Sequence, residues 1–243
     1  MNPTESFKTE CEVRVEAQGK NEKLLKASST FIEETIRSGY SYNFKWMGRP
    51  IIQYPQDMMA MQEIIWDIKP DLIIETGIAH GGSIIYYASL LELIGKGKVL
   101  GIDIDIREHN RVEIEKHPMS KRITMVQGSS IDIDIIDLVK PYAKDQEVVM
   151  VCLDSNHTHD HVLKELELYS QFVTPGSYLI AFDTIVEDLP SETYKDRPWS
   201  VGDNPKTAVH EFLKNNNAFI IDEHIDNKLL VSVAPNGYLK RIK

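Results

Sequence analysis

Residues 72–83, with the sequence LIIETGIAHGGS, constrain the fold more than any other stretch of this chain. A run of apolar residues reaches Glu75, a glycine-rich turn follows, and a helix-like run begins near Ser83. A strand that passes through such a turn into a helix brings backbone amides close to a nucleotide-like ligand and points the helix N-terminus at it. The segment therefore predicts the ligand-binding strand–turn–helix unit of a nucleoside-binding sheet.

A second strand is expected over residues 98–104, and it ends in acidic residues. Asp103 and Asp105 stand about twenty residues after the glycine turn, where a carboxylate can accept hydrogen bonds from a ribose diol. We therefore expect a nucleoside cofactor. The alternative is a tight turn that binds nothing.

The spacing of the glycines selects among nucleoside cofactors. A dinucleotide-binding turn usually reads G-x-G-x-x-G, because the middle glycine lets the backbone approach a pyrophosphate. Here Gly77 is followed by Ile78 and Ala79, and the next glycines are Gly81 and Gly82. The spacing favours a cofactor without a pyrophosphate, S-adenosylmethionine, over a nicotinamide dinucleotide.

The composition limits the classes of protein to consider. The 243 residues suffice for one substantial α/β domain, and the formal net charge of −10 argues against a nucleic-acid partner. No apolar run is long enough to cross a bilayer, and Cys11 and Cys152 do not make a disulfide framework. We expect a cytoplasmic homo-oligomer with no membrane partner, in which Cys152 is a buried thiol.

The beginning of the chain differs in composition from the rest. We divide the chain into a polar and helical N-terminal extension, residues 1–45, and a single domain, residues 46–243. Helical spacing of apolar residues is found at 21–38, and we expect weak order or a short strand at 1–21. Aromatic residues, glycine and proline at 40–54 indicate an irregular loop that could lie over a pocket.

Beyond residue 55, strand-like and helix-like runs alternate. After a helix at 56–68, strand-like runs are found at 72–76, 98–104, 122–127, 147–153 and 177–182. Helical patterns separate them at about 82–94, 107–117, 132–142 and 158–172. This alternation predicts an α/β fold, a parallel sheet with helices on both faces.

The end of the chain departs from this alternation. A helix at 205–215 is followed by strand-like runs at 218–222 and 228–233, with Asp226 and Asn227 between them. Two strands across a two-residue turn predict an antiparallel hairpin. We therefore expect a mostly parallel, seven-stranded sheet that ends in an antiparallel C-terminal hairpin.

Polar side chains gather where the predicted strands end, and ligands of parallel sheets bind outside the carboxyl ends of the strands. Asp154 ends one strand and Asp183 ends the next, so both carboxylates should reach the same crevice. Such an oxygen-rich pair suits a hard divalent cation such as Mg²⁺. Alternatively, each aspartate caps the segment that follows it.

Three histidines lie between residues 157 and 161. His157 is closest to the strand end and is our candidate general base, because an imidazole titrates near neutral pH. We expect His159 and His161 to face solvent or to cap the following helix. A zinc site is not expected, since no cysteine or histidine offers a third ligand at a suitable spacing nearby.

Residues 187–205 have no periodicity and follow the strand that ends at Asp183. A long irregular segment beside a site is usually a lid or a substrate-binding loop. Arg197 and Trp199 are its expected ligand contacts, and the alternative is that Trp199 only anchors the segment locally.

Between residues 46 and 241 the chain resembles the cephalosporin hydroxylase family. The matching segments are WMG, YPQD, KPDLIIETGIAHGGS, VLGIDIDIR, LDSNHTHDHVLKELELYSQFVTPGSY, FDT, DNPKTAVHEFL and KLLVSVAPNGYLKR. Despite its name, this family is similar to S-adenosylmethionine-dependent O-methyltransferases, including enzymes that act on rhamnosyl sugars and on a cephamycin precursor. The resemblance implies a Rossmann-like methyltransferase fold, with Mg²⁺ common among the nearest relatives.

The resemblance also implies roles for individual residues. The cofactor-binding residues that it implies are Glu75, Gly77, Ser83, Asp103, Ser129, Ser130 and Asp154. Among these, Asp103 matches the ribose-binding acid, and Ser129 and Ser130 match the loop near the adenine. Asp154 and Asp183 match two metal-binding carboxylates.

Two departures from the relatives concern the metal. The cephamycin enzyme has two adjacent acids at the second metal position, whereas Phe182 precedes Asp183 here. Catechol-type enzymes have an amide after that acid, whereas this chain has Thr184. The third protein ligand is therefore missing or replaced by water.

These features predict an S-adenosylmethionine-dependent O-methyltransferase that acts on a hydroxyl of a small molecule or sugar and is assisted by a divalent metal. Asp154 and His157 are the predicted catalytic residues, with methyl transfer by in-line displacement. The alternatives are a nicotinamide-dependent oxidoreductase on a similar sheet and a non-catalytic protein that binds S-adenosylmethionine.

Overall fold

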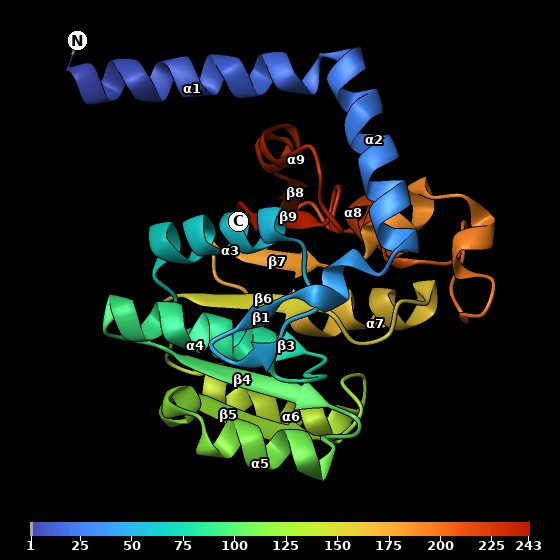
Figure 1. Ribbon diagram of the computed structural model, residues 1–243. Coiled ribbons are helices and arrows are strands. Elements are labelled where there is room, and N and C mark those ends of the chain that lie inside the picture. Colours follow the sequence, from blue (N-terminus) through green and yellow to red (C-terminus); the bar gives the residue numbers. More distant parts are fainter. Residues whose placement is uncertain (1) are drawn as a thin grey trace.

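The computed structural model describes residues 2–243, and its centre is a seven-stranded sheet flanked by helices (Figure 1). The strands of this sheet are β3 (Leu72–Thr76), β4 (Lys98–Asp103), β5 (Ile123–Gln127), β6 (Val149–Leu153), β7 (Tyr178–Ala181), β8 (Phe219–Ile221) and β9 (Tyr238–Arg241). A separate ribbon contains β1 (Lys45–Trp46) and β2 (Arg49–Pro50). The α-helices are α1 (Pro3–Gly19), α2 (Glu22–Arg37), α3 (Pro55–Ile68), α4 (Gly82–Ile94), α5 (Glu108–Lys116), α6 (Ile133–Ala143), α7 (His159–Tyr169), α8 (Pro205–Asn215) and α9 (Glu223–Leu229).

The strand order puts β3 near the centre of the sheet. The order is β5-β4-β3-β6-β7-β9-β8; the first five strands are parallel, and β9 is antiparallel to both of its neighbours. The chain moves outward from β3 to β5 and then resumes on the other side at β6, so the strand order reverses beside β3. This arrangement confirms the predicted sheet and favours a ligand site at the carboxyl ends of β3 and β6.

Two apolar cores cover the two faces of the sheet. Helices α3, α4 and α5 pack on one face, where Ile65, Ile84 and Ile114 are fully buried. Helices α6, α7 and α8 pack on the other face, with Leu166 and Phe212 in its core. The central strands are continuous apolar runs because both of their faces are buried. Among residues 2–243, no helix is both long and apolar enough to cross a membrane.

The N-terminal extension is more helical than the sequence indicated. Weak order or a short strand at 1–21 is wrong, because α1 occupies most of this range. The Asn2 side chain accepts a hydrogen bond from the N–H of Thr4, and Pro3 occupies the first turn, and both features favour a helix start. The sequence of α1 has no apolar pattern because only Val15 of this helix is buried. α1 lies beside α9, and the N-terminal end of α1 projects beyond the sheet (Figure 1). The division between residues 45 and 46 stays a prediction.

The C-terminal connection also differs from the prediction. Residues 223–229 form α9, so the two-residue turn at Asp226 and Asn227 and the strand at 228–233 are wrong. Asp226 instead accepts hydrogen bonds from the backbone N–H and side chain of Asn236, at 3.0 and 2.8 Å. β8 pairs with the later strand β9, which lies between β7 and β8. The antiparallel C-terminal strands are confirmed, but a helix connects them.

The segment at 40–54 is fixed against the glycine turn and α4. Trp46 Nε1 donates a hydrogen bond to Ser89 Oγ in α4 at 3.0 Å. The Arg49 guanidinium donates to the carbonyl oxygen of His80 in the glycine turn at 2.6 Å. These bonds hold the segment in a defined position, from which Gln53 reaches the carboxyl edge of the sheet.

Candidate active site

The glycine turn lies directly against the end of β6. Gly77 follows β3 with a φ of 90°, a conformation that favours glycine. A Cβ atom at this position would lie 2.0 Å from the carbonyl oxygen of Asp154. Glycine therefore allows the ends of β3 and β6 to approach each other, and the predicted cofactor turn touches the predicted metal carboxylate residue.

Glu75 is fully buried at the end of β3. Ser83, in the first turn of α4, donates a hydrogen bond to its Oε2 at 2.7 Å, whereas its buried Oε1 has no partner among the described residues. Burial raises the pKa of this carboxyl well above its usual value, and the charges of Asp154 and Asp103 add to the effect. A buried oxygen of this kind is one that a bound ligand can satisfy.

Asp103, at the end of β4, shapes the glycine turn. Its Oδ2 accepts hydrogen bonds from the N–H groups of Ile78 and Ala79 at 2.7 and 3.2 Å, and its Oδ1 accepts one from Asp105 at 3.0 Å. A carboxylate has about four lone-pair sites, so Asp103 can still accept a ribose hydroxyl. Asp105 is exposed and lies 3.8 Å from Arg107. Asp103 thus has a structural role that the sequence did not reveal.

The loop after β5 brings Ser129 and Ser130 to the same edge of the sheet. The N–H of Gly128 donates to the carbonyl oxygen of Asp103 at 2.9 Å, which ties the ends of β4 and β5 together. Ser130 is buried, and the hydroxyl of Tyr169 donates to its carbonyl oxygen at 2.9 Å. The predicted cofactor residues on β3, β4 and β5 therefore follow three adjacent strand ends.

The structure corrects the expectation that His159 and His161 face solvent or cap a helix. His159 Nδ1 lies 2.8 Å from Thr207 Oγ1 in α8. His161 Nε2 lies 3.2 Å from Ser130 Oγ and 3.5 Å from the buried carboxyl of Glu165. Both side chains make polar contacts with neighbouring groups, which local spacing could not show.

Asp154, His157 and Asp183 converge where β6 and β7 end. These strands are parallel neighbours, as predicted. His157 Nδ1 lies 3.1 Å from Asp183 Oδ2, and its Nε2 lies 3.5 Å from Asp154 Oδ1. One potential ligand atom from each of the three side chains lies within 4.8 Å of the others. The imidazole ring is thus held between the two carboxylates.

This arrangement shifts the pKa of Asp154 and of His157. Burial raises the pKa of Asp154 to about 6, and the charge of Asp183 contributes. Burial lowers the pKa of His157, but the carboxylates of Asp183 and Asp154 outweigh burial and raise it to about 9. The pKa of His157 therefore lies above the near-neutral value that the sequence led us to expect.

The donor set at these strand ends fits a hard divalent cation. Two carboxylates supply oxygen ligands, which Mg²⁺ prefers. Thr184, the residue after Asp183, is fully buried, and its hydroxyl donates to the carbonyl oxygen of Pro235 at 2.7 Å. Asp154 and Asp183 as metal ligands stay a prediction.

Sequence reasoning missed Gln53, which lies beside Asp154. The side chain is 6% exposed, and its Nε2 donates to Asp154 Oδ2 at 3.3 Å. Its Oε1 is buried and has no partner among residues 2–243. The sequence did offer one signal: Gln53 stands between the apolar residues Ile52 and Tyr54. An amide that is buried among apolar residues needs a polar partner, so its presence there indicates a polar group nearby.

The irregular segment at 187–205 brings Trp199 to His157. Their ring centroids lie 4.7 Å apart, with the planes tilted by 52°. The guanidinium of Arg197 lies 5.5 Å from the centroid of the Trp199 ring. The Nε1 atom of Trp199 is buried and has no hydrogen-bond partner in the described chain. Trp199 therefore packs against the histidine of the candidate site, and its predicted contact with a ligand stays a prediction.

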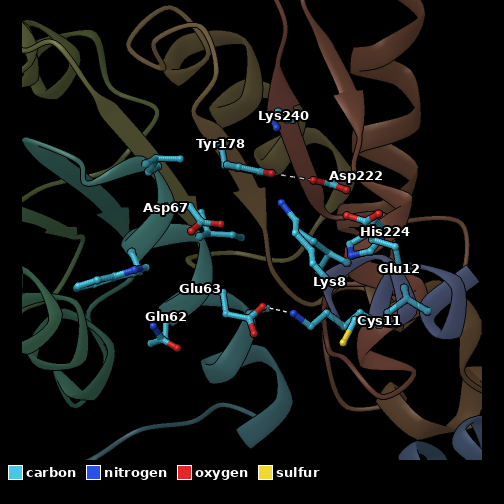
Figure 2. Close-up of a pocket in the computed structure, with 17 residues that line it drawn as sticks. Lys8, Cys11, Glu12, Gln62, Glu63, Asp67, Tyr178, Asp222, His224 and Lys240 are labelled. Carbon is cyan, nitrogen blue, oxygen red and sulfur yellow. Dashed lines mark hydrogen bonds and ion pairs between the residues drawn. The ribbon is translucent and has the colours of Figure 1, made fainter. Parts of the chain in front are cut away.

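A separate cavity of about 480 Å³ lies between α1, α3 and the C-terminal elements (Figure 2). Lys8 and Glu12 of α1 line it together with Asp67 of α3. On its far wall the hydroxyl of Tyr178 donates to Asp222 at 2.7 Å (Figure 2). Tyr178 begins β7, so this cavity lies at the amino end of that strand, opposite the acids, and does not belong to the candidate active site.

Comparison with known proteins assigns this chain to a family. A sequence profile described as rhamnosyl O-methyltransferase/CmcI matches residues 38–242. The chain belongs to the rhamnosyl O-methyltransferase/CmcI family. This confirms the family predicted from the sequence and the enzyme class, an S-adenosylmethionine-dependent O-methyltransferase.

Individual relatives agree with this assignment. The rhamnosyl O-methyltransferase of Mycobacterium tuberculosis (strain ATCC 25618 / H37Rv) is 28% identical over 224 residues, which cover 88% of this chain and 86% of the relative. The structure of CmcI-D160 with Mg and SAM has a TM-score of 0.60 at 19% identity, covering 83% of this chain and 78% of that one. An O-methyltransferase from Bacillus cereus in complex with SAH has a TM-score of 0.52 at 14% identity, covering 89% and 91%. The two structures confirm the methyltransferase fold.

Proposed function

We propose that this protein transfers a methyl group from S-adenosylmethionine to a hydroxyl of a sugar, and that a divalent cation assists the reaction. The main support is the contact of Gly77 with the backbone of Asp154, since it joins the glycine turn to the acids at one edge of the sheet. A sugar is favoured because the mycobacterial relative is a rhamnosyl O-methyltransferase. A rhamnosyl group is therefore the first acceptor to test.

The cofactor would lie across the ends of β3, β4 and β5. The buried Oε1 of Glu75 and the N–H groups at the start of α4 are suited to the amino-acid end of S-adenosylmethionine. Asp103 would accept the ribose hydroxyls. Ser129 and Ser130, on the adjoining strand end, would lie near the adenine.

Asp154 and Asp183 would hold the cation, and when bound it would stabilise the negative charge that develops on the acceptor oxygen. His157 is the proposed general base. Neutralising the two carboxylates removes the cause of its raised pKa and favours the neutral imidazole. That imidazole then accepts the proton of the acceptor hydroxyl.

The acceptor would bind against Trp199. This ring packs on His157, so a sugar that rests on the indole would present a hydroxyl close to the imidazole. Arg197, which lies over the same indole, would contact the polar groups of the acceptor. Both residues come from the irregular segment at 187–205, which is a suitable place for acceptor specificity.

Two measurements test this function. Isothermal titration should show binding of S-adenosylmethionine and its demethylated product, and no binding of NAD. Methyl transfer from labelled S-adenosylmethionine to a rhamnoside, compared with a matched glucoside, tests the acceptor. Transfer that stops with EDTA and returns with Mg²⁺ supports the proposal, whereas binding of NAD in place of S-adenosylmethionine contradicts it.

A further inference from the structure

We propose that Gln53 supplies the third protein oxygen to the divalent cation that Asp154 and Asp183 would hold. This inference rests on the proposed function and concerns how this chain completes the ligand set. The hydroxyl of Thr184, the nearest candidate in sequence to Asp183, is hydrogen-bonded to the carbonyl oxygen of Pro235, whereas the buried amide oxygen of Gln53 has no partner in the described chain. Gln53 comes from a distant segment and already touches Asp154.

The distance from the Gln53 amide to Asp154 matches the spacing of two adjacent ligands around a small cation. Its Nε2 lies 3.3 Å from Asp154 Oδ2. Half a turn of the amide exchanges Nε2 and Oε1 with little change in shape, which puts the oxygen where the nitrogen is now. Adjacent oxygen ligands of an octahedral Mg²⁺ lie about 3 Å apart, because each lies about 2.1 Å from the metal. The amide oxygen therefore fits beside Asp154 Oδ2 without any movement of the backbone.

Electrostatics favours this exchange when a cation is present. A carboxylate alone attracts the amide N–H, which is the orientation in the structure, and this leaves Oε1 buried without a donor. A cation next to the carboxylate repels the N–H group and attracts the carbonyl oxygen. Hydrogen bonds from Trp46 and Arg49 hold the preceding residues in place, so the amide can turn while its segment stays fixed.

His157 is the competing third ligand, because its ring lies near both acids. Mg²⁺ prefers oxygen to imidazole nitrogen. With Gln53 as the ligand, the protein supplies three oxygens and the imidazole stays available to accept a proton. The two alternatives differ in which substitution weakens metal binding.

The test is Mn²⁺ affinity, measured from the electron paramagnetic resonance signal of free Mn²⁺ with the demethylated cofactor present. Gln53→Ala should weaken Mn²⁺ binding at least about tenfold. Gln53→Glu should restore or exceed the wild-type affinity, since it keeps an oxygen at the same place. Gln56→Ala is the matched control: Gln56 also has a buried amide oxygen without a partner in the described chain, and its substitution should leave Mn²⁺ affinity unchanged.

The same series can overturn the inference. If Gln53 only orients Asp154 through its N–H group, Gln53→Glu will bind Mn²⁺ as weakly as Gln53→Ala. If His157 is the ligand instead, His157→Ala will weaken binding and Gln53→Ala will not. If Gln53→Ala binds Mn²⁺ with wild-type affinity while Asp154→Asn abolishes Mn²⁺ binding, Gln53 is not a metal ligand, and the proposed metal site at the two aspartates stands. If the wild-type protein binds no Mn²⁺, both the proposed metal site and the role of Gln53 in it are rejected. Melting temperature and affinity for the demethylated cofactor confirm that each variant is folded.

Discussion

The glycine turn after β3 and the acids after β6 and β7 lie side by side, but they are built differently. The turn is formed by neighbouring residues, and its shape depends on the φ of Gly77 and on backbone hydrogen bonds to Asp103. The acids come from two strands with a helix between them, and their charges meet at His157. The backbone forms the first region, and charged side chains form the second.

This difference has a functional consequence. The N–H groups of Gly77, Ile78, Ala79 and Gly81 have partners within the protein, so the shape of the turn is set before a ligand binds. The acid pair has excess negative charge that only a cation or the His157 imidazolium can balance. We therefore expect the turn to control cofactor affinity and the acid pair to control the rate.

The largest effect is expected at the acid pair. Asp154→Asn should lower kcat by about 10³-fold, because the acceptor oxygen loses several kcal/mol of electrostatic stabilisation. Affinity for the demethylated cofactor, measured by calorimetry, should stay at the wild-type value, because the proposed ribose and adenine contacts lie at the ends of β4 and β5; a loss of affinity would support the predicted cofactor-binding role of Asp154 instead. Asp183→Asn and EDTA should have the same effect on kcat. A large loss of cofactor affinity in either variant would break the division of roles between the two regions.

His157 tests whether the acid pair acts together with a base. His157→Ala should lower kcat by about 10²-fold and leave cofactor binding unchanged, since only proton removal is affected. His159→Ala is the matched control, because His159 contacts Thr207 and lies 3.3 Å from Glu211 in α8. If His157→Ala slows turnover by less than about threefold, His157 is a bystander and proton removal passes to water.

Gly77 is the point where the two regions meet, so its substitution should affect both. Gly77→Ala should lower the free energy of unfolding by at least about 2 kcal/mol, through backbone strain and the clash with Asp154, and should weaken cofactor binding and turnover together. Gly95 provides the control: it has the same φ of 90°, but a Cβ there would have nothing within 4 Å. Gly95→Ala should cost only about 1 kcal/mol. Equal losses in urea unfolding would show that the contact with Asp154 is unimportant.

The smallest effect is expected at Asp103. Asp103→Ala should weaken binding of the demethylated cofactor about tenfold, since it removes a charged acceptor for ribose and for the turn. The kcat at saturating S-adenosylmethionine should change little. Asp105→Ala should leave calorimetric affinity unchanged, because Asp105 is exposed and pairs only with Arg107 in this region. The reverse result would make Asp105 the ribose ligand.

The elements that the sequence predicted well are those whose burial is decided locally. β3 and β6 are fully buried and mostly apolar, so their residues showed a clear pattern. α1 was missed because it buries a single residue, Val15, and so has no apolar face to detect. The hairpin was wrong because β9 pairs with β7 as well as β8, and such pairing depends on the whole sheet.

For the candidate site, the sequence by itself determined the strand–turn–helix at 72–83, the acid at the end of β4 and the acids at the ends of β6 and β7, because each is a local pattern of residue types. Only the tertiary structure decided which groups meet. Gln53 and Asp154 are 101 positions apart in the chain, and no spacing connects them. The raised pKa of His157 likewise depends on the distance to Asp183, which belongs to another strand. Charge and hydrogen bonding act through space, so their balance at this site is fixed by the packing of the sheet rather than by neighbours in the sequence.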